Sequence, residues 1–280
     1  MDSNFLTKFL LTDRVAVITG GGGLLGRQHA MALLELQATV VLTDISDDYL
    51  VLAKKEVESH KYAGRCFIEQ MDVSSKESIL RVSDKILREH GRVDILINNA
   101  AINPKVELSR GLTNSSRFEN FDVDDWNQQL SVGLTGAILC SQIFGKNILK
   151  NGNGGVILNI SSDLSVISPD QRLYRQENLV EELQSVKPVS YSVIKSGLIG
   201  LTRYLSTYWA DRQVRVNALS PGGVYNGQNE EFTKRLSRLI PLGRMANADE
   251  YRAAVQFLCS DASLYLNGQN IVMDGGRSVW

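Results

Sequence analysis

Residues 14–26 read RVAVITGGGGLLG: a short apolar run, four consecutive glycines and the apolar start of a further segment. A β-branched apolar run of this length is typical of a buried strand, and residues 24–36 have helical spacing. Glycines between a strand and a helix let the backbone approach a pyrophosphate, for which the helix N-terminus supplies free N–H groups. We therefore expect Gly20, Gly23 and Gly26 to hold a dinucleotide, although a plain turn would use the same glycines.

Strand-like and helix-like segments alternate outward from this unit. Because the strands are continuous apolar runs, we expect burial on both faces, as in a parallel sheet with right-handed crossovers. We predict an α/β fold, a Rossmann-type doubly wound parallel sheet with helices on both faces, in a single domain over residues 1–280 with its core at about 14–276. The expected strands are 14–19, 39–43, 65–70, 93–97, 155–160, 214–218 and 270–273, and the expected helices are 24–36, 48–60, 76–90, 122–149 and 189–210.

Two long polar segments, 104–121 and 163–188, interrupt the alternation after the fourth and fifth strands. Both follow carboxyl ends of strands, where open α/β sheets bind ligands. They are either walls of a binding cleft or surface insertions, since long irregular segments are usually functional or disordered. Their cations favour a polar substrate, because guanidinium groups suit carboxylates and phosphates. These cations include Lys105, Arg110, Arg117, Arg172, Arg175 and Lys187.

The composition excludes several classes of protein. The chain has 280 residues with 30 basic and 31 acidic side chains, so it lacks the basic excess of a nucleic-acid-binding protein. No apolar run approaches the roughly 18 residues of a membrane span, and the N-terminus does not resemble a signal peptide. Three widely spaced cysteines fit free thiols in a reducing cytoplasm, and no metal site is expected.

Asp44 ends the second expected strand, downstream of the glycine turn. A carboxylate there can accept hydrogen bonds from the adenosine ribose hydroxyls and would repel a 2′-phosphate, which favours NAD over NADP. An aspartate in this place can also cap a turn, and Arg27 at the start of the next helix weakens the argument. We predict NAD as the cofactor.

Further motifs follow in order, and together they resemble the short-chain dehydrogenase/reductase family over residues 14–276. The motifs are the glycine turn, Asp72-Val73, Asn98-Asn99-Ala100-Ala101, Asn159-Ile160-Ser161-Ser162, Tyr191-Ser192-Val193-Ile194-Lys195 and Ser220-Pro221-Gly222-Gly223. The resemblance implies a homo-oligomer, a tetramer or a dimer. It also implies that the cofactor contacts Leu25 in the glycine turn, Asp72 and Val73 beside the adenine, Asn99 and Ala100 after the fourth strand, and Pro221, Gly222 and Val224 near the nicotinamide.

The predicted catalytic residues are Ser162, Tyr191 and Lys195. Tyr191 and Lys195 stand four positions apart, so a helix places them on one face, and both also contact the cofactor in the family. A nearby ammonium favours a phenolate and lowers its pKa, so the phenol can exchange a proton with the reacting oxygen. Ser162, preferred over Ser161 by the resemblance, can hydrogen-bond to that oxygen while nicotinamide carries the hydride.

Three features depart from the family pattern. The TGxxGxxG spacing of the glycine turn is also typical of an extended branch with sugar-nucleotide epimerases and dehydratases. Gly133 stands where the family often has an Asn of a proton relay; its carbonyl can still serve the relay, and a glycine inside a helix can mark a kink. The segment between Ser162 and Tyr191 has about twice the usual length.

These observations predict an NAD-dependent oxidoreductase that interconverts a secondary alcohol and a carbonyl on a polar substrate, such as a sugar or sugar phosphate. Residues 165–211 resemble a subgroup linked to bacterial flagellin and surface-sugar modification, an association by likeness alone. Two alternatives stay open: an epimerase or dehydratase that uses bound NAD transiently, and a non-catalytic NAD-binding subunit. Release of NADH during turnover would distinguish a dehydrogenase from the first alternative, which keeps its cofactor bound. NAD binding without turnover would indicate the second alternative.

Overall fold

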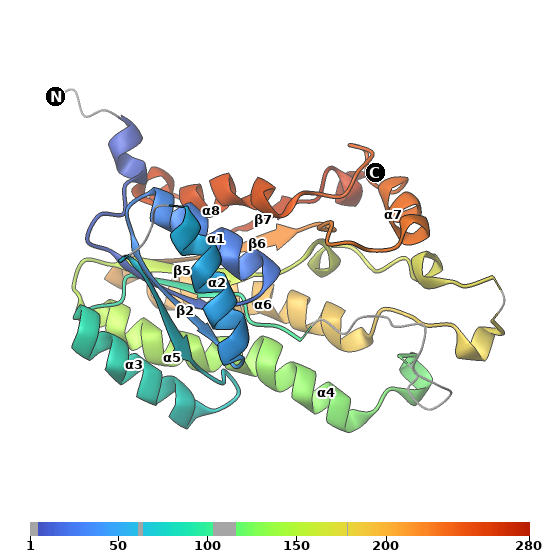
Figure 1. The fold of residues 1–280 in the computed structure, drawn as a ribbon, viewed down its shortest axis with the longest axis horizontal. Coiled ribbons are helices and arrows are strands. Elements are labelled where there is room, and N and C mark those ends of the chain that lie inside the picture. The colour runs from blue at the N-terminus through green and yellow to red at the C-terminus, as the bar shows by residue number, and fades with distance from the viewer. Residues whose placement is uncertain (1–4, 61–63, 103–115, 178) are drawn as a thin grey trace.

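The computed structural model describes residues 5–60, 64–102, 116–177 and 179–280, and its centre is one parallel sheet of seven strands (Figure 1). The strands lie in the order β3-β2-β1-β4-β5-β6-β7, and every neighbouring pair is parallel. The strand order reverses between β1 and β4, which is where such sheets bind ligands at the carboxyl ends of the strands. The predicted doubly wound α/β fold is confirmed.

The predicted strands, and the predicted helices other than 122–149, agree with the observed ones within a few residues, whereas two helices, Glu230–Ser237 and Arg252–Cys259, were not predicted. The strands are β1 (Val15–Thr19), β2 (Thr39–Asp44), β3 (Cys66–Gln70), β4 (Ile95–Asn98), β5 (Gly155–Ile160), β6 (Val214–Pro221) and β7 (Asn270–Met273). The α-helices are α1 (Leu24–Glu35), α2 (Asp47–Ser59), α3 (Lys76–His90), α4 (Val123–Leu130), α5 (Gly136–Lys150), α6 (Val189–Tyr208), α7 (Glu230–Ser237) and α8 (Arg252–Cys259). The shorter helical turns are η1 (Phe5–Phe9), η2 (Phe118–Asn120), η3 (Ser131–Thr135), η4 (Asp163–Ser165), η5 (Gln171–Tyr174), η6 (Glu181–Leu183), η7 (Ala210–Arg212), η8 (Ala248–Tyr251), η9 (Asp261–Ser263) and η10 (Arg277–Val279).

Alternate residues along the strands pack against two layers of helices. Ala16 and Ile18 of β1 face the layer of α1, α2 and α8, which lies above the sheet in Figure 1. Val15 and Val17 face the layer of α3, α5 and α6 below it. Successive strand residues point to opposite faces, so a sheet covered on both sides requires strands that are apolar throughout. All three cysteines are free and buried, as predicted.

The segment expected as one helix over 122–149 is divided by a wider turn. The π-helical turn η3 separates α4 from α5, and Gly133 lies buried at its centre. A β-carbon at Gly133 would lie 2.8 Å from the Cγ2 atom of Ile194 in α6. Glycine at this position therefore lets α6 approach η3 closely. The irregularity expected at Gly133 takes the form of a π-turn.

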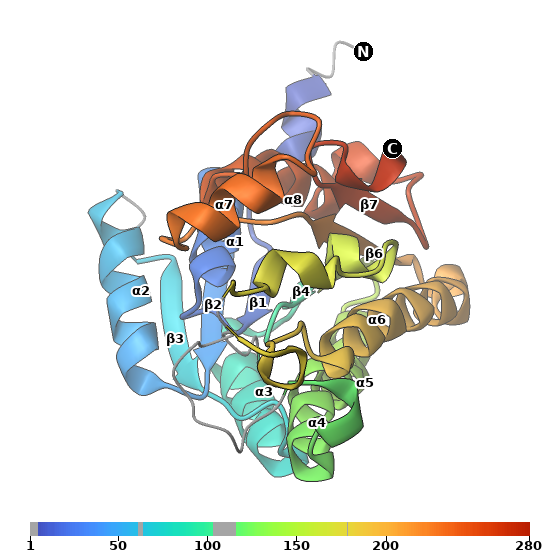
Figure 2. The same cartoon turned by 90° about the vertical axis from the view of Figure 1, so that its right-hand side faces the viewer.

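The segment 163–188 forms a wall rather than a surface insertion. Its described residues, 163–177 and 179–188, contain η4, η5 and η6 and cross the carboxyl edge of the sheet between α6 and α7 (Figure 2). Most of the other polar segment, 103–115 with Lys105 and Arg110, lies outside the described residues. Arg117, just beyond it, donates to the carbonyl oxygen of Glu181 at 2.8 Å.

The stretch Val123–Lys150 is long and apolar enough to cross a membrane by length and composition, which no apolar run in the sequence suggested. However, 56% of its most apolar window is buried inside the protein. Cys140 and Phe144 of this stretch are fully buried against the sheet. Packing in the core therefore accounts for its apolar character.

Candidate active site

The glycine turn between β1 and α1 is fixed by close backbone contacts. Gly20 has a φ of +61°, which favours glycine, and a β-carbon on it would lie 2.8 Å from the Cα atom of Ala100. A β-carbon on Gly26 would lie 2.4 Å from the carbonyl oxygen of Gly20. The turn therefore requires glycine at both positions.

The N-terminus of α1 fits the pyrophosphate of a dinucleotide. Its N-cap residue, Gly23, has no side chain that could accept hydrogen bonds from the first-turn N–H groups. Leu24 and Leu25 of that turn line a cavity at the carboxyl edge of the sheet. Backbone donors and the positive end of the helix dipole thus face a space that an anion can enter.

Asp44 lies at the end of β2, beside this turn. One of its carboxylate oxygens accepts from the N–H of Gly22 at 3.1 Å, and the other accepts from the N–H of Ser46 at 3.1 Å. These bonds hold the carboxylate against the glycine turn, where it is partly exposed. Each carboxylate oxygen can accept more than one hydrogen bond, so Asp44 can brace the turn and still accept from a ribose hydroxyl.

The chain after β4 is bonded to the same turn. The side-chain amide of Asn99 donates to the carbonyl oxygens of Thr19 and Gly20, at 3.0 Å each. The Thr19 hydroxyl accepts from the backbone N–H groups of Asn99 and Ala100, at 3.0 Å each. Asn99 and Ala100 are therefore hydrogen-bonded to the glycine turn, beside the cavity where they were predicted to contact the cofactor.

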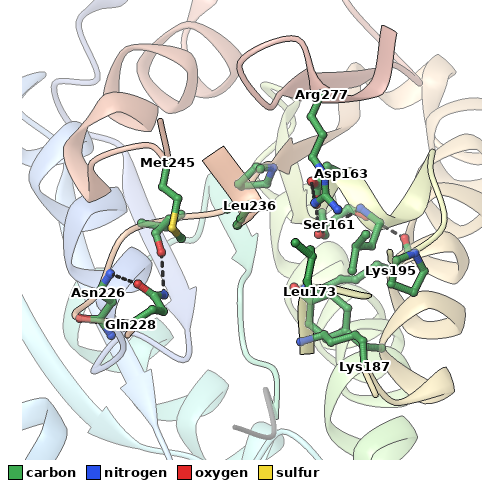
Figure 3. Close-up of a pocket in the computed structure, with 18 of the residues that line it drawn as sticks. Ser161, Asp163, Leu173, Lys187, Lys195, Asn226, Gln228, Leu236, Met245 and Arg277 are labelled. Atoms are coloured by element: carbon green, nitrogen blue, oxygen red, sulfur yellow. Dashed lines mark hydrogen bonds and ion pairs between the residues drawn. The ribbon is translucent and has the colours of Figure 1, made fainter. Parts of the chain in front are cut away.

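Ser162, Tyr191 and Lys195 meet at one cavity of about 380 Å³, of which Figure 3 shows the Lys195 side. The Ser162 hydroxyl lies beside the Tyr191 hydroxyl and acts to lower its pKa. The Lys195 ammonium lies 5.7 Å from the centre of the Tyr191 ring and donates to the carbonyl oxygen of Ile160 at 2.8 Å. Ser161 donates instead to the backbone carbonyl of Lys195 at 2.7 Å, so Ser162 is the serine that engages Tyr191.

Burial dominates the protonation of these groups. It raises the pKa of the Tyr191 hydroxyl, although the neighbouring Ser162 hydroxyl acts in the opposite direction. Burial, assisted by the charge of Lys187, lowers the pKa of Lys195 to about 8. Lys195 was expected to lower the pKa of Tyr191, but in the chain by itself the desolvation of the phenolate raises that pKa, and Lys195 is not among the groups that shift it.

A buried ion pair beside Tyr191 was missed by the sequence analysis. The Asp163 carboxylate pairs with the Arg277 guanidinium at 2.8 Å, and the two side chains are only 4% and 9% exposed. Asp163 also accepts from the Ser162 hydroxyl at 2.9 Å. The acidic residue directly after Ser162 was a usable signal, whereas Arg277 had no local signal.

A second lysine lies on the Tyr191 ring. The Lys187 ammonium is 3.9 Å from the ring centre, closer than that of Lys195. Burial lowers the pKa of Lys187 to about 8, although the charge of Asp163 raises it. The sequence analysis counted Lys187 only among the cations of 163–188, and its place four positions before Tyr191 was the signal that could have found it.

The cavity brings together many of the predicted site residues. Those that line it are Leu25, Asn99, Ser162, Tyr191, Lys195, Pro221, Gly222 and Val224. Those that form the adjoining glycine turn and its contacts are Gly20, Gly23, Gly26, Asp44 and Ala100. Asp72 and Val73, just after β3, do not line it: the Asp72 carboxylate accepts from Ser74 at 2.6 Å, and Val73 packs against Gly136. Lining residues that were not predicted include Asn226, Gln228 and Met245, on the opposite wall in Figure 3.

Comparison with known proteins agrees with this geometry. A family model described as short chain dehydrogenase matches residues 14–174, and a model described as Enoyl-(Acyl carrier protein) reductase matches residues 179–278. The chain belongs to the short-chain dehydrogenase/reductase family. It is therefore an oxidoreductase of this family that binds a nicotinamide dinucleotide.

Two relatives in this family are polyol dehydrogenases. An NAD-dependent glycerol dehydrogenase of Listeria innocua is 30% identical over 97% of this chain and 96% of its own length. A D-threitol dehydrogenase of Mycolicibacterium smegmatis is also 30% identical, over 97% of this chain and 95% of its own length.

Two solved structures of family members differ in their cofactors. A short-chain dehydrogenase of Leptospira borgpetersenii with bound NAD+ has a TM-score of 0.81 at 29% identity, covering 100% of this chain and 97% of that one. A gluconate 5-dehydrogenase of Burkholderia cenocepacia, in complex with NADP and tartrate, has a TM-score of 0.81 at 26% identity, covering 98% and 99%. Family membership therefore leaves the choice between NAD and NADP to the residues of each chain.

Proposed function

We propose that this protein is an NAD-dependent dehydrogenase that interconverts a secondary alcohol and a carbonyl on a small polyhydroxylated substrate. The convergence of Ser162, Tyr191 and Lys195 on a cavity that adjoins the open N-terminus of α1 carries the proposal. The glycine turn and the catalytic group lie at one edge of the sheet, so a dinucleotide held at that helix end would have its nicotinamide within reach of Tyr191.

Tyr191 is the proposed general acid and base. Its hydroxyl gives a proton to the reacting oxygen during reduction and takes it back during oxidation. Ser162, whose hydroxyl lies beside that of Tyr191, donates to the same oxygen and stabilises the charge that develops there. Lys195 holds a positive charge near the phenol, which favours proton release from its hydroxyl. The nicotinamide, when bound, supplies or accepts the hydride.

Asp44 supports NAD rather than NADP. Its carboxylate is fixed beside the glycine turn by two backbone donors, where a 2′-phosphate would meet a negative charge. Asp72 and Val73 are proposed to border the adenine, although they lie outside the cavity itself.

The substrate class follows from the cavity and the relatives. The lining combines hydroxyl, amide and charged groups with apolar side chains in similar number, and its polar groups suit the hydroxyls of a small polar molecule. The polyol dehydrogenases among the relatives support the same class. A role in flagellin or surface-sugar modification is a narrower proposal, which rests only on the likeness of residues 165–211 to that subgroup.

We further propose a cytoplasmic single-domain enzyme that forms a homo-oligomer. A groove of about 730 Å³ between α3, α5 and α6 carries exposed apolar side chains. Tyr204 and Tyr208 stack there at 5.5 Å and are 62% and 61% exposed. An apolar face of this kind supports association between copies.

The test is a panel of polyols, aldonates and sugar phosphates of three to six carbons, followed at the NADH absorbance band with NAD and, separately, with NADP. We expect multiple-turnover reduction of NAD by at least one compound and slower reduction of NADP. Product formation without release of NADH would favour the epimerase or dehydratase alternative. NAD binding without any turnover would favour a non-catalytic subunit, and faster reduction of NADP would contradict the role given to Asp44.

A further inference from the structure

Lys187 faces the cavity beside Tyr191 from the end of the segment 163–188. Lys187 directly precedes Pro188, the N-cap of α6. The Lys187 side chain therefore lies at the N-terminal end of the helix that carries Tyr191. Its ammonium lies 3.9 Å from the centre of the Tyr191 ring, within cation–π distance. Figure 3 shows it on the same wall as Asp163 and Lys195.

The charged groups that line this cavity, within the described part of the chain, are mainly cationic. They are Lys187, Lys195 and Arg277 against Asp163 and Asp170. Asp170 forms an ion pair with the exposed Arg172 at 2.8 Å, and Asp163 is paired with Arg277. The space in front of Tyr191 therefore has a positive potential, to which the two lysines close to the ring contribute most.

The three cations lie in different places relative to Tyr191. Arg277 is held in its buried pair with Asp163, and Lys195 donates to the Ile160 carbonyl behind Tyr191. Lys187 presents its ammonium to the cavity over the Tyr191 ring, in the space that a substrate must enter to reach the phenol.

We propose that Lys187 binds an anionic group of the substrate, a carboxylate or a phosphate, close to the reacting carbon. This inference rests on the proposed function, because Tyr191 is what places the reacting oxygen. Lys187 lies over the ring whose hydroxyl serves that oxygen, so the anion and the reacting carbon are near each other. Charge-assisted hydrogen bonds are the stronger kind, and partial exclusion of water strengthens them further.

Protonation of Lys187 is compatible with this role. Burial lowers its pKa to about 8, which leaves the ammonium charged at neutral pH. The titratable groups that line the cavity with it are Asp163 from η4, Asp170 and Tyr174 at η5, Tyr191 and Lys195 from α6, and Arg277 from η10. A bound anion would offset the cationic excess of this set.

The test measures binding to the NAD-loaded protein by isothermal titration calorimetry, using matched sets of a neutral polyol, the aldonate and the polyol phosphate of equal chain length. We expect at least one anion to bind roughly tenfold or more tightly than its matched polyol. In Lys187→Gln and Lys187→Met this preference should fall roughly tenfold or more, and Lys187→Arg should keep it. The aldonate and phosphate arms identify which anion is used.

The matched control is Lys234→Gln in α7, which removes the same charge from an exposed lysine paired with Glu230. An anion preference that is absent from the parent protein, or equal in Lys187→Gln and Lys234→Gln, would overturn the inference. Turnover is scored separately. Anion binding through Lys187 without reduction of NAD or NADP by any compound would overturn the proposed function alone, and turnover of neutral polyols with no preference for anions would overturn the inference alone.

Discussion

The glycine turn at residues 20–26 and the charged wall, formed by the side chains of Asp163, Lys187 and Arg277, meet at the same cavity. Backbone groups form the first, whereas charged side chains form the second. The turn is shaped by close backbone approach, since a β-carbon on Gly26 would lie 2.4 Å from a carbonyl oxygen, and its binding groups are N–H donors. The wall is shaped by side-chain charge, including an ion pair at 2.8 Å that is almost completely buried. A substitution in the turn acts through steric conflict, whereas one in the wall acts through desolvated charge.

The two regions also differ in what we expect them to bind. The turn is expected to bind the pyrophosphate, a group shared by all dinucleotides, and a short sequence motif suffices to describe such a turn. The wall is assembled from 163–188 and the end of the chain, which are distant in sequence. The wall is therefore where we expect this enzyme to differ from relatives that share the same turn.

The largest effect is expected at Tyr191, where the two regions meet. Tyr191→Phe removes the hydroxyl and should lower kcat by roughly 10²- to 10⁴-fold, because proton transfer to the reacting oxygen is lost. NAD affinity, measured by calorimetry, should stay near that of the parent protein. Tyr204→Phe, on an exposed face of the same helix, is the control. Retained turnover in Tyr191→Phe would remove this residue from its proposed role.

The buried ion pair should give the largest loss of stability. Asp163→Asn leaves the Arg277 charge buried without its partner, and we expect the free energy of unfolding to fall by about 3–5 kcal/mol. Glu58→Gln removes the surface pair with Lys54, whose side chains are 39% and 37% exposed, and should cost about 0–1 kcal/mol. Urea denaturation measures both variants. Equal losses would mean that the wall does not depend on buried charge.

Acid should destabilise the cofactor side through His29, a fully buried residue of α1. Burial lowers its pKa from 6.5 to about 4. The unfolded chain therefore binds this proton first as the pH falls, and about 3 kcal/mol of stability should be lost between pH 6.5 and 4. His29→Gln removes the titration, so its stability should fall less steeply over that range. An unchanged slope in denaturation curves at several pH values would contradict this expectation.

Steric conflict at the glycine turn should have an intermediate effect. Gly26→Ala places a β-carbon 2.4 Å from the Gly20 carbonyl oxygen, and we expect NAD binding to weaken by roughly 1–3 kcal/mol. Gly200→Ala in α6 is the matched control, because nothing lies within 4 Å of its β-carbon. That change should stabilise the helix by about 0.5–1 kcal/mol and leave NAD affinity unaltered. Equal NAD affinities in the two variants would show that the turn can relax.

The smallest effect is expected at Asp44. Asp44→Ala removes the acceptor for the N–H groups of Gly22 and Ser46, and we expect NAD binding to weaken by about 1 kcal/mol. The ratio of NADP to NAD activity should rise, since a negative charge near the 2′-position is lost. Asp48→Ala, at an exposed place in α2, provides the control. An unchanged ratio of NADP to NAD activity would mean that Asp44 braces the glycine turn but does not determine which cofactor is used.

The sheet was predictable because its strands are short apolar runs that need no distant information. The end of β6 was less predictable. Ser220 and Pro221 extend this strand beyond the predicted residue 218, because they pair in register with Val272 and Met273 of β7. An irregularity at Gly133 was expected from the glycine, but neither its π-helical form nor the close approach of Ile194 is contained in local spacing. The catalytic motif could be located, but the sign of the Tyr191 pKa shift depends on burial, which no motif encodes.

The contact between Gly133 and Ile194 also constrains how this chain can change over evolutionary time. A β-carbon at 133 has 2.8 Å to the nearest methyl carbon of Ile194, so the two positions share one volume. An asparagine at 133 becomes acceptable only after position 194 has become smaller. In an alignment of descendants and relatives, these two positions should covary in size, and along any lineage the reduction at 194 should come first.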